Sequence, residues 1–269
     1  MTPPLYVHAS PDAEIAGAVG SVVASLPVSF APATGSADVA AVAGHPGWTE
    51  RAAQAVRQGF RGVVVADPVA EDPAALAVAA AERGAVVVLD QQWAGNPVLA
   101  ATQAPVKKVI ADALADAVLL DSVAYSTPGH DPADLLTNHL AAVLQTGVDL
   151  HGLRVLQRST HGYMVVGKMA NGAPVALHGI TTASVPPTAT VSILTSTGRT
   201  DISLPDASAA WPAGVRSVTT AGATTLPSIY ESAHRHSWRR LHERIESGGP
   251  SADLQQFAAL NSILSRLNA

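Results

Sequence analysis

Cysteine is absent from this chain of 269 residues. Its absence excludes disulfide bonds, thiolate nucleophiles and zinc sites with cysteine ligands, although it does not decide the compartment. Aromatic residues are also few, at 4% of the chain, whereas apolar residues make up 48% and are dominated by alanine, valine and leucine. A core of such residues is typical of helices packed on a sheet.

Long hydrophobic runs and a strong excess of one charge are missing as well. No apolar run approaches the ~18 residues that cross a bilayer. The start, MTPPLYVHAS, lacks the basic and apolar regions of a signal peptide. The formal charge of -5 gives no basic footprint for nucleic acid. We therefore expect a cytoplasmic protein that binds neither a membrane nor a nucleic acid.

Apolar runs alternate with helical patterns through the first part of the chain. The run GVVVA at 62–66 is short and β-branched, as buried strands of parallel sheets are. A proline follows a capping residue at 10–11 and again at 72–73, which marks two helix starts. This alternation predicts a doubly wound, Rossmann-like parallel sheet over residues 1–98. Its other strands are expected at 5–9, 27–31, 37–43 and 85–90.

Strand-like runs dominate residues 99–269, the second predicted domain. One helix at 132–146 interrupts them, and two helices close the chain, the first begun by a capping box at 228–231. Hairpin-type connections separate several of the runs. These features predict an open antiparallel sheet with helices on one face, whose other face meets water or a partner. The runs lie at 116–125, 153–160, 163–169, 174–181, 189–196 and 199–205.

One stretch resembles a known family. Residues 44–97, GHPGWTERAAQAVRQGFRGVVVADPVAEDPAALAVAAAERGAVVVLDQQWAGNP, follow the element order of the Gfo/Idh/MocA family, and RSTHGYMVVG and the tail 230–257 are similar to its sheet strand and closing helices. Members are nicotinamide-dependent sugar and inositol oxidoreductases that pair a Rossmann domain with an open antiparallel sheet, which often dimerises. The resemblance implies this fold, shortened, and a homodimer through the open face of the sheet.

The chain departs from the family where the nicotinamide cofactor would bind. The family's first turn carries G-x-G-x-x-G, whose glycines let backbone N–H groups approach the pyrophosphate. Here the turn reads HASPDAE, in which Pro11 has no N–H and Asp12 and Glu14 add carboxylates. The second strand ends without an acidic or basic residue for the ribose. The sequence therefore predicts that the nicotinamide site is lost and that no cofactor is bound.

Asp67 is the first candidate catalytic residue. It follows the buried strand 62–66 at the carboxyl end, where parallel sheets bind their ligands. By the resemblance, Asp67 takes the place of a lysine that lies between the nicotinamide and the substrate hydroxyl. A carboxylate there is either a general acid or base, an acceptor for a polyol, or simply a turn residue before Pro68.

His139 is the second candidate catalytic residue. It can be matched to the histidine of the family's active-site helix, but the two acids of that motif then fall on Leu135 and Ala142. His139 also shares an apolar stripe with Leu136 and Val143, which is equally typical of a satisfied core histidine.

Five further residues are candidates for substrate contacts. Gln91 and Gln92 could bind hydroxyl groups and Trp93 could stack on a sugar face, or all three could belong to a polar loop with one packed aromatic residue. His130 lies at the start of the predicted helix, either as a contact or as a loop residue. Asp134 lies near the motif's acids, out of register.

A basic cluster at 234–244, HRHSWRRLHER, resembles a metal or anion site at first sight. Helical spacing places His234, Trp238 and Leu241 on one face and Arg235 and Arg239 on the other. The spacing favours a packed helix with a basic outer face, and no metal is predicted. The chain also has no H-E-x-x-H, G-x-S-x-G or P-loop spacing.

Three functional hypotheses remain open at this level. The favoured one is a protein that binds a polyhydroxylated or related small molecule, as a cofactor-independent lyase, isomerase or hydratase or as a non-catalytic subunit. The alternative is an NAD(P)-dependent sugar-type dehydrogenase with an unusual cofactor mode. A third is a structural partner whose open sheet docks on an active homologue, which would give a hetero-oligomer. One acid and one histidine are compatible with both catalyst and binder.

Overall fold

The computed structural model describes residues 3–100, 104–209, 211–248 and 252–268. The chain forms two compact units, which we describe separately. The first comprises Met1–Gln92 and Ala233–Arg266, and the second comprises Trp93–Ser232 and Leu267–Ala269. The sequence had assigned both closing helices to the second domain. Residues 233–266 group with the first unit because Trp238 and Leu241 are buried in the core of its parallel sheet.

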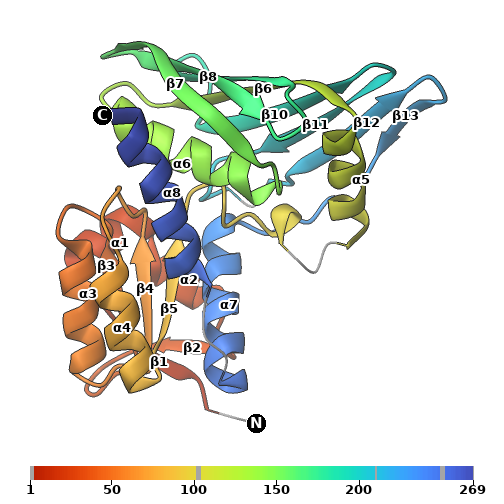
Figure 1. Cartoon of the computed structure of the whole chain (residues 1–269). Coiled ribbons are helices and arrows are strands. Elements are labelled where there is room, and N and C mark those ends of the chain that lie inside the picture. Colours follow the sequence, from red (N-terminus) through yellow and green to blue (C-terminus); the bar gives the residue numbers. More distant parts are fainter. Residues whose placement is uncertain (1–2, 101–103, 210, 249–251, 269) are drawn as a thin grey trace. The chain divides into compact units, whose positions relative to one another are not determined.

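The first unit is built on a five-stranded parallel sheet with the order β2-β1-β3-β4-β5. Strands and helices alternate along its chain, as Figure 1 shows. Its elements are β1 (Leu5–Ala9), α1 (Pro11–Gly17), α2 (Val19–Ala24), β2 (Phe30–Pro32), β3 (Val39–Ala43), α3 (Trp48–Arg57), β4 (Gly62–Ala66), α4 (Ala74–Arg83), β5 (Val86–Asp90), α7 (Ala233–Ser247) and α8 (Asp253–Asn268).

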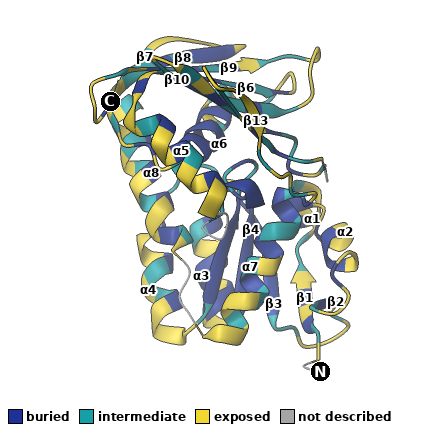
Figure 2. Ribbon diagram, turned by 90° about the vertical axis from the view of Figure 1, so that its right-hand side faces the viewer, coloured by how far each residue is buried: buried dark blue, intermediate teal, exposed yellow. Residues whose placement is uncertain are grey.

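Helices cover both faces of this sheet. Helices α3 and α4 pack together on one face, and α1, α2 and α7 pack on the other. Figure 2 shows the central strands β3 and β4 buried between helices whose outer faces are exposed. On the α7 face, the ring of Trp238 meets that of Phe30 edge-on at 5.1 Å. The run of buried Val and Ala in these strands explains why they read as continuous apolar segments rather than alternating ones.

The second unit is built on an eight-stranded sheet with the order β13-β12-β11-β10-β6-β9-β8-β7. Alternate residues of its central strands are buried on one face, including Leu120 and Ser122 opposite Ile193 and Val191. Helices α5 and α6 contact the sheet. The elements are η1 (Pro97–Leu99), α5 (Ala104–Ala115), β6 (Ala117–Ser126), α6 (Pro132–Gln145), β7 (Leu150–Ser159), β8 (Gly162–Met169), β9 (Pro174–Thr181), β10 (Thr188–Thr195), β11 (Gly198–Leu204), β12 (Gly214–Thr219) and β13 (Gly222–Thr225).

The predicted fold class, a parallel Rossmann-like sheet followed by an open sheet with helices, is confirmed, with differences in detail. The second sheet is mixed, because β9 returns beside β6 in a parallel sense. Helix α5 and strands β12 and β13 were not predicted. The capping box at 228–231 is wrong, since α7 begins at Ala233 and Ile229 instead forms a bridge with Ala213. None of the helices among the described residues has the length and apolar character needed to span a membrane.

Candidate functional site

The carboxyl edge of the five-stranded sheet is where open parallel sheets bind their ligands. In its first loop, from β1 to α1, three backbone N–H groups donate hydrogen bonds within the protein. The Ser10 N–H donates to the Ala41 carbonyl at 3.3 Å, the Ala13 N–H to the Ser10 Oγ at 3.2 Å, and the Glu14 N–H to the Ser10 carbonyl at 3.0 Å. Pro11 has no N–H to offer. The turn is therefore a self-capped helix start rather than an open cradle of donors.

The Glu14 carboxylate has a local structural partner. It accepts a hydrogen bond from the Gly20 N–H at 2.7 Å, which stabilises the start of α2. Ala18 separates the helices α1 and α2, because its backbone is left-handed with a φ of 45° and interrupts the helical hydrogen bonding. Asp12, in contrast, is exposed in the first turn of α1.

The loops that follow β3 and β4 are joined by backbone hydrogen bonds. The Gly44 N–H donates to the Ala66 carbonyl at 2.7 Å, and the Val69 N–H donates to the Gly44 carbonyl at 2.9 Å. A Cβ atom on Gly44 would lie 2.4 Å from the Asp67 carbonyl oxygen. Only glycine permits this approach, which fixes the position of the loop that carries Asp67.

Asp67 lies at this edge in an unusual conformation. Its φ of 50° is left-handed, a conformation that aspartate and asparagine tolerate better than most residues. Its N–H donates to the Asp90 carbonyl at 3.0 Å, so the pairing of β4 with β5 continues one residue past the strand. The residue is half-buried. A functional role for its carboxylate remains a proposal.

Asp90 and His234 form a buried pair that the sequence did not predict. The Asp90 Oδ2 atom lies 2.8 Å from the Nδ1 atom of His234. Asp90 ends β5 and His234 lies in the first turn of α7, so the pair links the edge of the sheet to a helix that is distant in the sequence. The other carboxylate oxygen of Asp90 is buried and has no hydrogen-bond partner among the described residues. The placement of His234 on the inner face of α7 agrees with the predicted packed helix.

Glu71 occupies the N-terminus of α3 at the same edge. Its carboxylate accepts from the N–H groups of Gly47 at 2.9 Å and Trp48 at 3.2 Å, and from the Thr49 hydroxyl at 2.7 Å. These are the donors that a helix start would otherwise offer to a bound anion. The second helix start on this edge is therefore also satisfied by the chain itself.

The amide-rich segment after β5 contains three of the predicted contact residues. Gln91 and Gln92 are half-buried, and both belong to the first unit. Trp93 begins the second unit and is buried, and its indole N–H has no hydrogen-bond partner in the part of the chain that the structure describes. A buried ring has no open face for stacking on a sugar, so the packed-aromatic interpretation fits Trp93 better.

His139 lies at the centre of a buried hydrogen-bonded chain in the second unit. Its Nε2 atom is 2.6 Å from the Ser122 Oγ, and its Nδ1 atom is 2.8 Å from the Tyr163 hydroxyl. The Ser122 hydroxyl donates its single proton to the Thr190 carbonyl at 2.8 Å, so it accepts from His139. The network thus assigns a neutral imidazole with the proton on Nε2, and the Tyr163 hydroxyl donates to Nδ1.

Burial determines the protonation of the side chains in this hydrogen-bonded network. It lowers the pKa of His139 from 6.5 to about 3, with a smaller contribution from His178. It also raises the pKa of the Tyr163 hydroxyl well above its usual value, against a smaller opposing effect of Arg158. Both ring nitrogens of His139 are occupied and its ring is fully buried. The geometry favours the satisfied core histidine over the catalytic interpretation.

His130 and Asp134 flank the start of α6. The helix is capped by Asp131, whose side chain accepts from the Ala133 N–H at 2.8 Å. His130 lies in the loop before this cap, and its Nε2 atom is buried with no hydrogen-bond partner within the described ranges. Asp134 is half-buried in the first turn. Over the described ranges, no group of three or more histidine, aspartate or glutamate side chains is placed to hold a metal ion.

Comparisons with known proteins give similarity in structure but not in sequence. No family model matches the chain, and no curated protein does. The structure of KijD10, a 3-ketoreductase from Actinomadura kijaniata, in complex with NADP is similar over 98% of this chain and 88% of that chain, with a TM-score of 0.71 and 15% identity. Its complex with NADP and TDP-benzene gives 98% and 97% coverage, a TM-score of 0.70 and 14% identity.

A second enzyme has the same architecture. UDP-N-acetylglucosamine 3-dehydrogenase GnnA from Acidithiobacillus ferrooxidans covers 94% of this chain and 86% of its own, with a TM-score of 0.64 and 13% identity. At these identities the comparisons establish the fold.

The favoured hypothesis of a cofactor-independent enzyme or non-catalytic subunit is contradicted by these comparisons. The similar structures are a ketoreductase with bound NADP and a dehydrogenase, and they match nearly the whole chain rather than one of its units. The hypothesis relied on departures from the family pattern at the first turn, at the end of the second strand and at Asp67. In both of its units, the chain has the fold of the Gfo/Idh/MocA-type oxidoreductases.

Proposed function

We propose that this chain is an oxidoreductase that uses a nicotinamide dinucleotide on a sugar-type substrate, and that it holds the dinucleotide in an unusual mode. The observation that supports the proposal is the similarity over 98% of the chain to KijD10, a 3-ketoreductase whose structure contains NADP. The other similar enzyme is also named as a dehydrogenase of a sugar nucleotide.

The turn from β1 to α1 does not fit a pyrophosphate in the way that a glycine-rich turn does. Its N–H groups at Ser10, Ala13 and Glu14 are used within the chain. The exposed carboxylate of Asp12 would also repel a phosphate placed there. The unusual mode therefore places the pyrophosphate away from this turn.

The proposed contact with the substrate is Asp67. Its carboxylate is half-buried at the carboxyl edge of the sheet, and its loop is held by Gly44 and by the hydrogen bond to Asp90. A fixed carboxylate is a good acceptor for a sugar hydroxyl, because charge-assisted hydrogen bonds are stronger than neutral ones. Gln91 and Gln92 remain proposed partners for further hydroxyls.

Titration calorimetry tests the proposal directly. NAD and NADP, each oxidised and reduced, are titrated into the full chain, and at least one form is expected to bind with a dissociation constant of about micromolar. A panel of nucleotide-linked sugars is then assayed by the absorbance of the reduced nicotinamide. If no form binds below about millimolar, the proposed function is wrong.

A variant of the first turn tests the mode of binding. Asp12→Ala removes an exposed carboxylate without touching the Ser10 cap. If the pyrophosphate lies elsewhere, the affinity for the dinucleotide changes by less than about threefold, as in the control Glu82→Ala on the surface of α4. A gain of about tenfold on removing Asp12 would place the phosphates at this turn and contradict the unusual mode.

We also propose that the chain forms a homodimer through the open face of its eight-stranded sheet. Helices cover one face, while the other carries the exposed side chain of Ile180 and a contact at 3.5 Å between the His178 Nε2 atom and the Asp121 carboxylate. An uncovered sheet face of mixed apolar and paired polar residues is suited to a second copy.

A further inference from the structure

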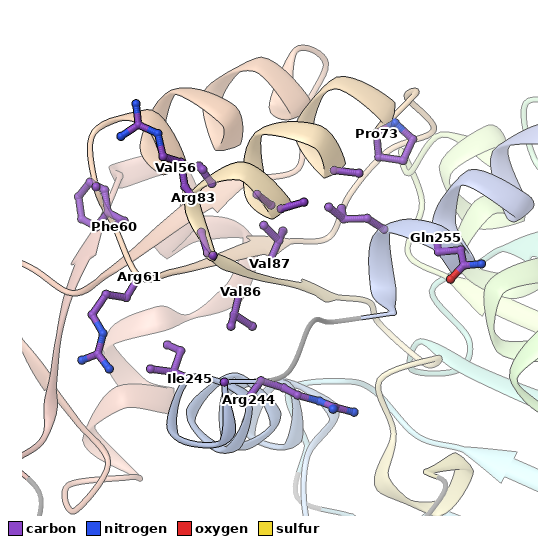
Figure 3. A pocket seen from close by; sticks show the side chains of 18 of the residues that line it. Val56, Phe60, Arg61, Pro73, Arg83, Val86, Val87, Arg244, Ile245 and Gln255 are labelled. Atoms are coloured by element: carbon purple, nitrogen blue, oxygen red, sulfur yellow. The ribbon is translucent and has the colours of Figure 1, made fainter.

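Helix α7 lies alongside β5 and runs in the opposite direction. At the beginning of β5, Val86 is directed toward Ile245 near the end of α7, as Figure 3 shows, and both residues line a groove of about 960 Å³. At the other end of β5, Asp90 contacts His234 in the first turn of α7. His234 is therefore placed at the carboxyl edge of the sheet, where open parallel sheets bind their ligands.

The groove at the opposite end lacks a group that could accept a proton. Apart from Gln255 and three arginines, its lining is apolar, and it includes no aspartate, glutamate or histidine. Arginine stays protonated in proteins, so it cannot act as a base. The oxidation of a sugar hydroxyl releases a proton, and the acceptor of this proton therefore has to lie elsewhere.

The pair of Asp90 with His234 has an inner and an outer member. The Asp90 side chain is 1% exposed, whereas the His234 side chain is 11% exposed. Helix α1 also approaches the carboxylate, since a Cβ atom on Gly17 would lie 3.9 Å from the Asp90 Oδ2 atom. A ligand at this edge can therefore contact the imidazole, while the carboxylate lies behind the ring.

The hydrogen bond of the pair determines which nitrogen of His234 is basic. A carboxylate only accepts hydrogen bonds, so the Nδ1 atom, 2.8 Å from the Asp90 Oδ2, carries a proton. In the neutral ring the lone pair then belongs to Nε2. When Nε2 takes up a second proton, the ring becomes positive beside a buried negative charge, which stabilises the charged ring.

The pair is also joined to the proposed sugar contact. The Asp67 N–H donates to the Asp90 carbonyl at 3.0 Å. The two aspartates therefore end neighbouring strands, β4 and β5, and such strands lie about 4.8 Å apart. A sugar held by the Asp67 carboxylate at this edge is thus close to the start of α7.

We propose that His234 accepts the proton of the sugar hydroxyl in the proposed oxidation and that Asp90 is its positioning residue, an inference that rests on the proposed function. The O–H bond of the hydroxyl breaks, its proton passes to Nε2 of His234, and its electron pair becomes the second bond of the carbonyl. The dinucleotide supplies the acceptor for the hydride that leaves the same carbon. In the reverse reduction, the ring returns the proton to the oxygen.

Steady-state kinetics with the nucleotide-linked sugar of the panel that the wild type turns over test the role of His234. His234→Gln is expected to lower kcat by about 100-fold or more, because a general base contributes on this scale. The KM of the sugar and the dissociation constant of the dinucleotide are expected to stay within about threefold. The control His45→Gln changes an exposed histidine in the loop after β3 and is expected to keep kcat within about twofold.

Chemical rescue separates a lost base from a disturbed fold. His234→Ala leaves space at the start of α7, and added imidazole is expected to raise its turnover by at least about tenfold. The same concentration of imidazole is expected to leave the turnover of the wild type and of His45→Gln unchanged. A merely structural role of His234 predicts no rescue.

The role of Asp90 is read from the tautomer of the ring. In the full chain without ligands, the ¹⁵N spectrum of labelled histidines is expected to show neutral His234 with its proton on Nδ1. Asp90→Asn is expected to shift the proton toward Nε2 and to lower kcat by at least about tenfold, because the wrong nitrogen then faces the substrate. The spectrum requires neither dinucleotide nor sugar.

Three results overturn the inference. The first is a folded His234→Gln variant whose kcat stays within about threefold of the wild type. The second is His234→Ala without rescue by imidazole. The third is a wild-type spectrum with the proton of His234 on Nε2. If the dinucleotide binds and the wild type turns over the sugar, these results contradict only the role of the pair, whereas a dinucleotide that does not bind contradicts the proposed function itself.

Discussion

The left-handed conformation of Asp67 separates the backbone role of this residue from that of its charge. Asparagine adopts this conformation as readily as aspartate, whereas alanine loses roughly 1–2 kcal/mol there. Asp67→Asn is therefore expected to change the free energy of unfolding by less than about 1 kcal/mol and to abolish sugar binding or turnover. Asp67→Ala is expected to lower the free energy of unfolding and also to abolish sugar binding or turnover. Urea denaturation and a turnover assay measure the two effects, and full activity in the Asn variant would remove the carboxylate from the site.

His139 makes the stability of the protein depend on pH. Its pKa is lowered to about 3 in the folded protein, so below its unfolded value of 6.5 the unfolded state binds more protons. Its contribution is therefore fully present above about 6.5 and is lost as the pH falls toward 3. Thermal unfolding between neutral and acidic pH measures this slope.

The matched variant for this slope is His139→Gln. It is expected to be less stable than the wild type at neutral pH, because it disrupts the bonds to Ser122 and Tyr163. Its stability should fall less steeply with acid, since the carboxylates are common to both proteins. An equal slope in both proteins would show that His139 titrates normally.

The environment of a single residue could be predicted from the sequence only where it depends on neighbouring positions in the chain. The apolar stripe around His139 offered a core interpretation, but only the fold brings Ser122 and Tyr163 onto its two nitrogens. The pair of Asp90 with His234 joins residues 144 positions apart, and no local pattern reports such a contact. The position of Asp67 after β4 was predicted, because the end of a buried strand can be read directly from the neighbouring residues.

At the scale of elements, Glu71 holds the start of α3. Glu71→Ala removes the acceptor of the Gly47 and Trp48 N–H groups and is expected to lower the free energy of unfolding by about 1–2 kcal/mol. Glu71→Gln keeps an acceptor oxygen and should lose less. The control Glu82→Ala, on the exposed surface of α4, is expected to stay within about 0.5 kcal/mol. Equal losses in the Ala variants of Glu71 and Glu82 would contradict the capping role.

Elements were predictable where their signals are local. The buried strands β3, β4 and β5 and the proline-started helices stand out in the sequence. Helix α5 was missed although Val106, Ile110 and Ala113 have helical spacing, so its signal was present. The false capping box shows the opposite case, because the bridge of Ile229 with Ala213 holds the backbone extended and overrides a local helix preference.

At the scale of the whole molecule, the proposed dimer can be tested by sedimentation. The wild type is expected to be a dimer at micromolar concentration that buries more than ~1,000 Å². Ile180→Asp places a charge on the open sheet face and is expected to shift the equilibrium to monomer. The control Val78→Asp makes the same kind of change on exposed α4 and should remain dimeric. A monomeric wild type would rule the dimer out.

The bonds that join the loops after β3, β4 and β5 have a consequence for recognition. Gly44 is tied to Ala66 and Val69, and Asp67 is tied to Asp90, so the three loops share one backbone network beyond the ends of their strands. A surface of this kind cannot close around a ligand by moving one loop at a time. We expect it to be rigid in the free protein, so that binding of the proposed sugar substrate would cost little conformational entropy and would select molecules by shape.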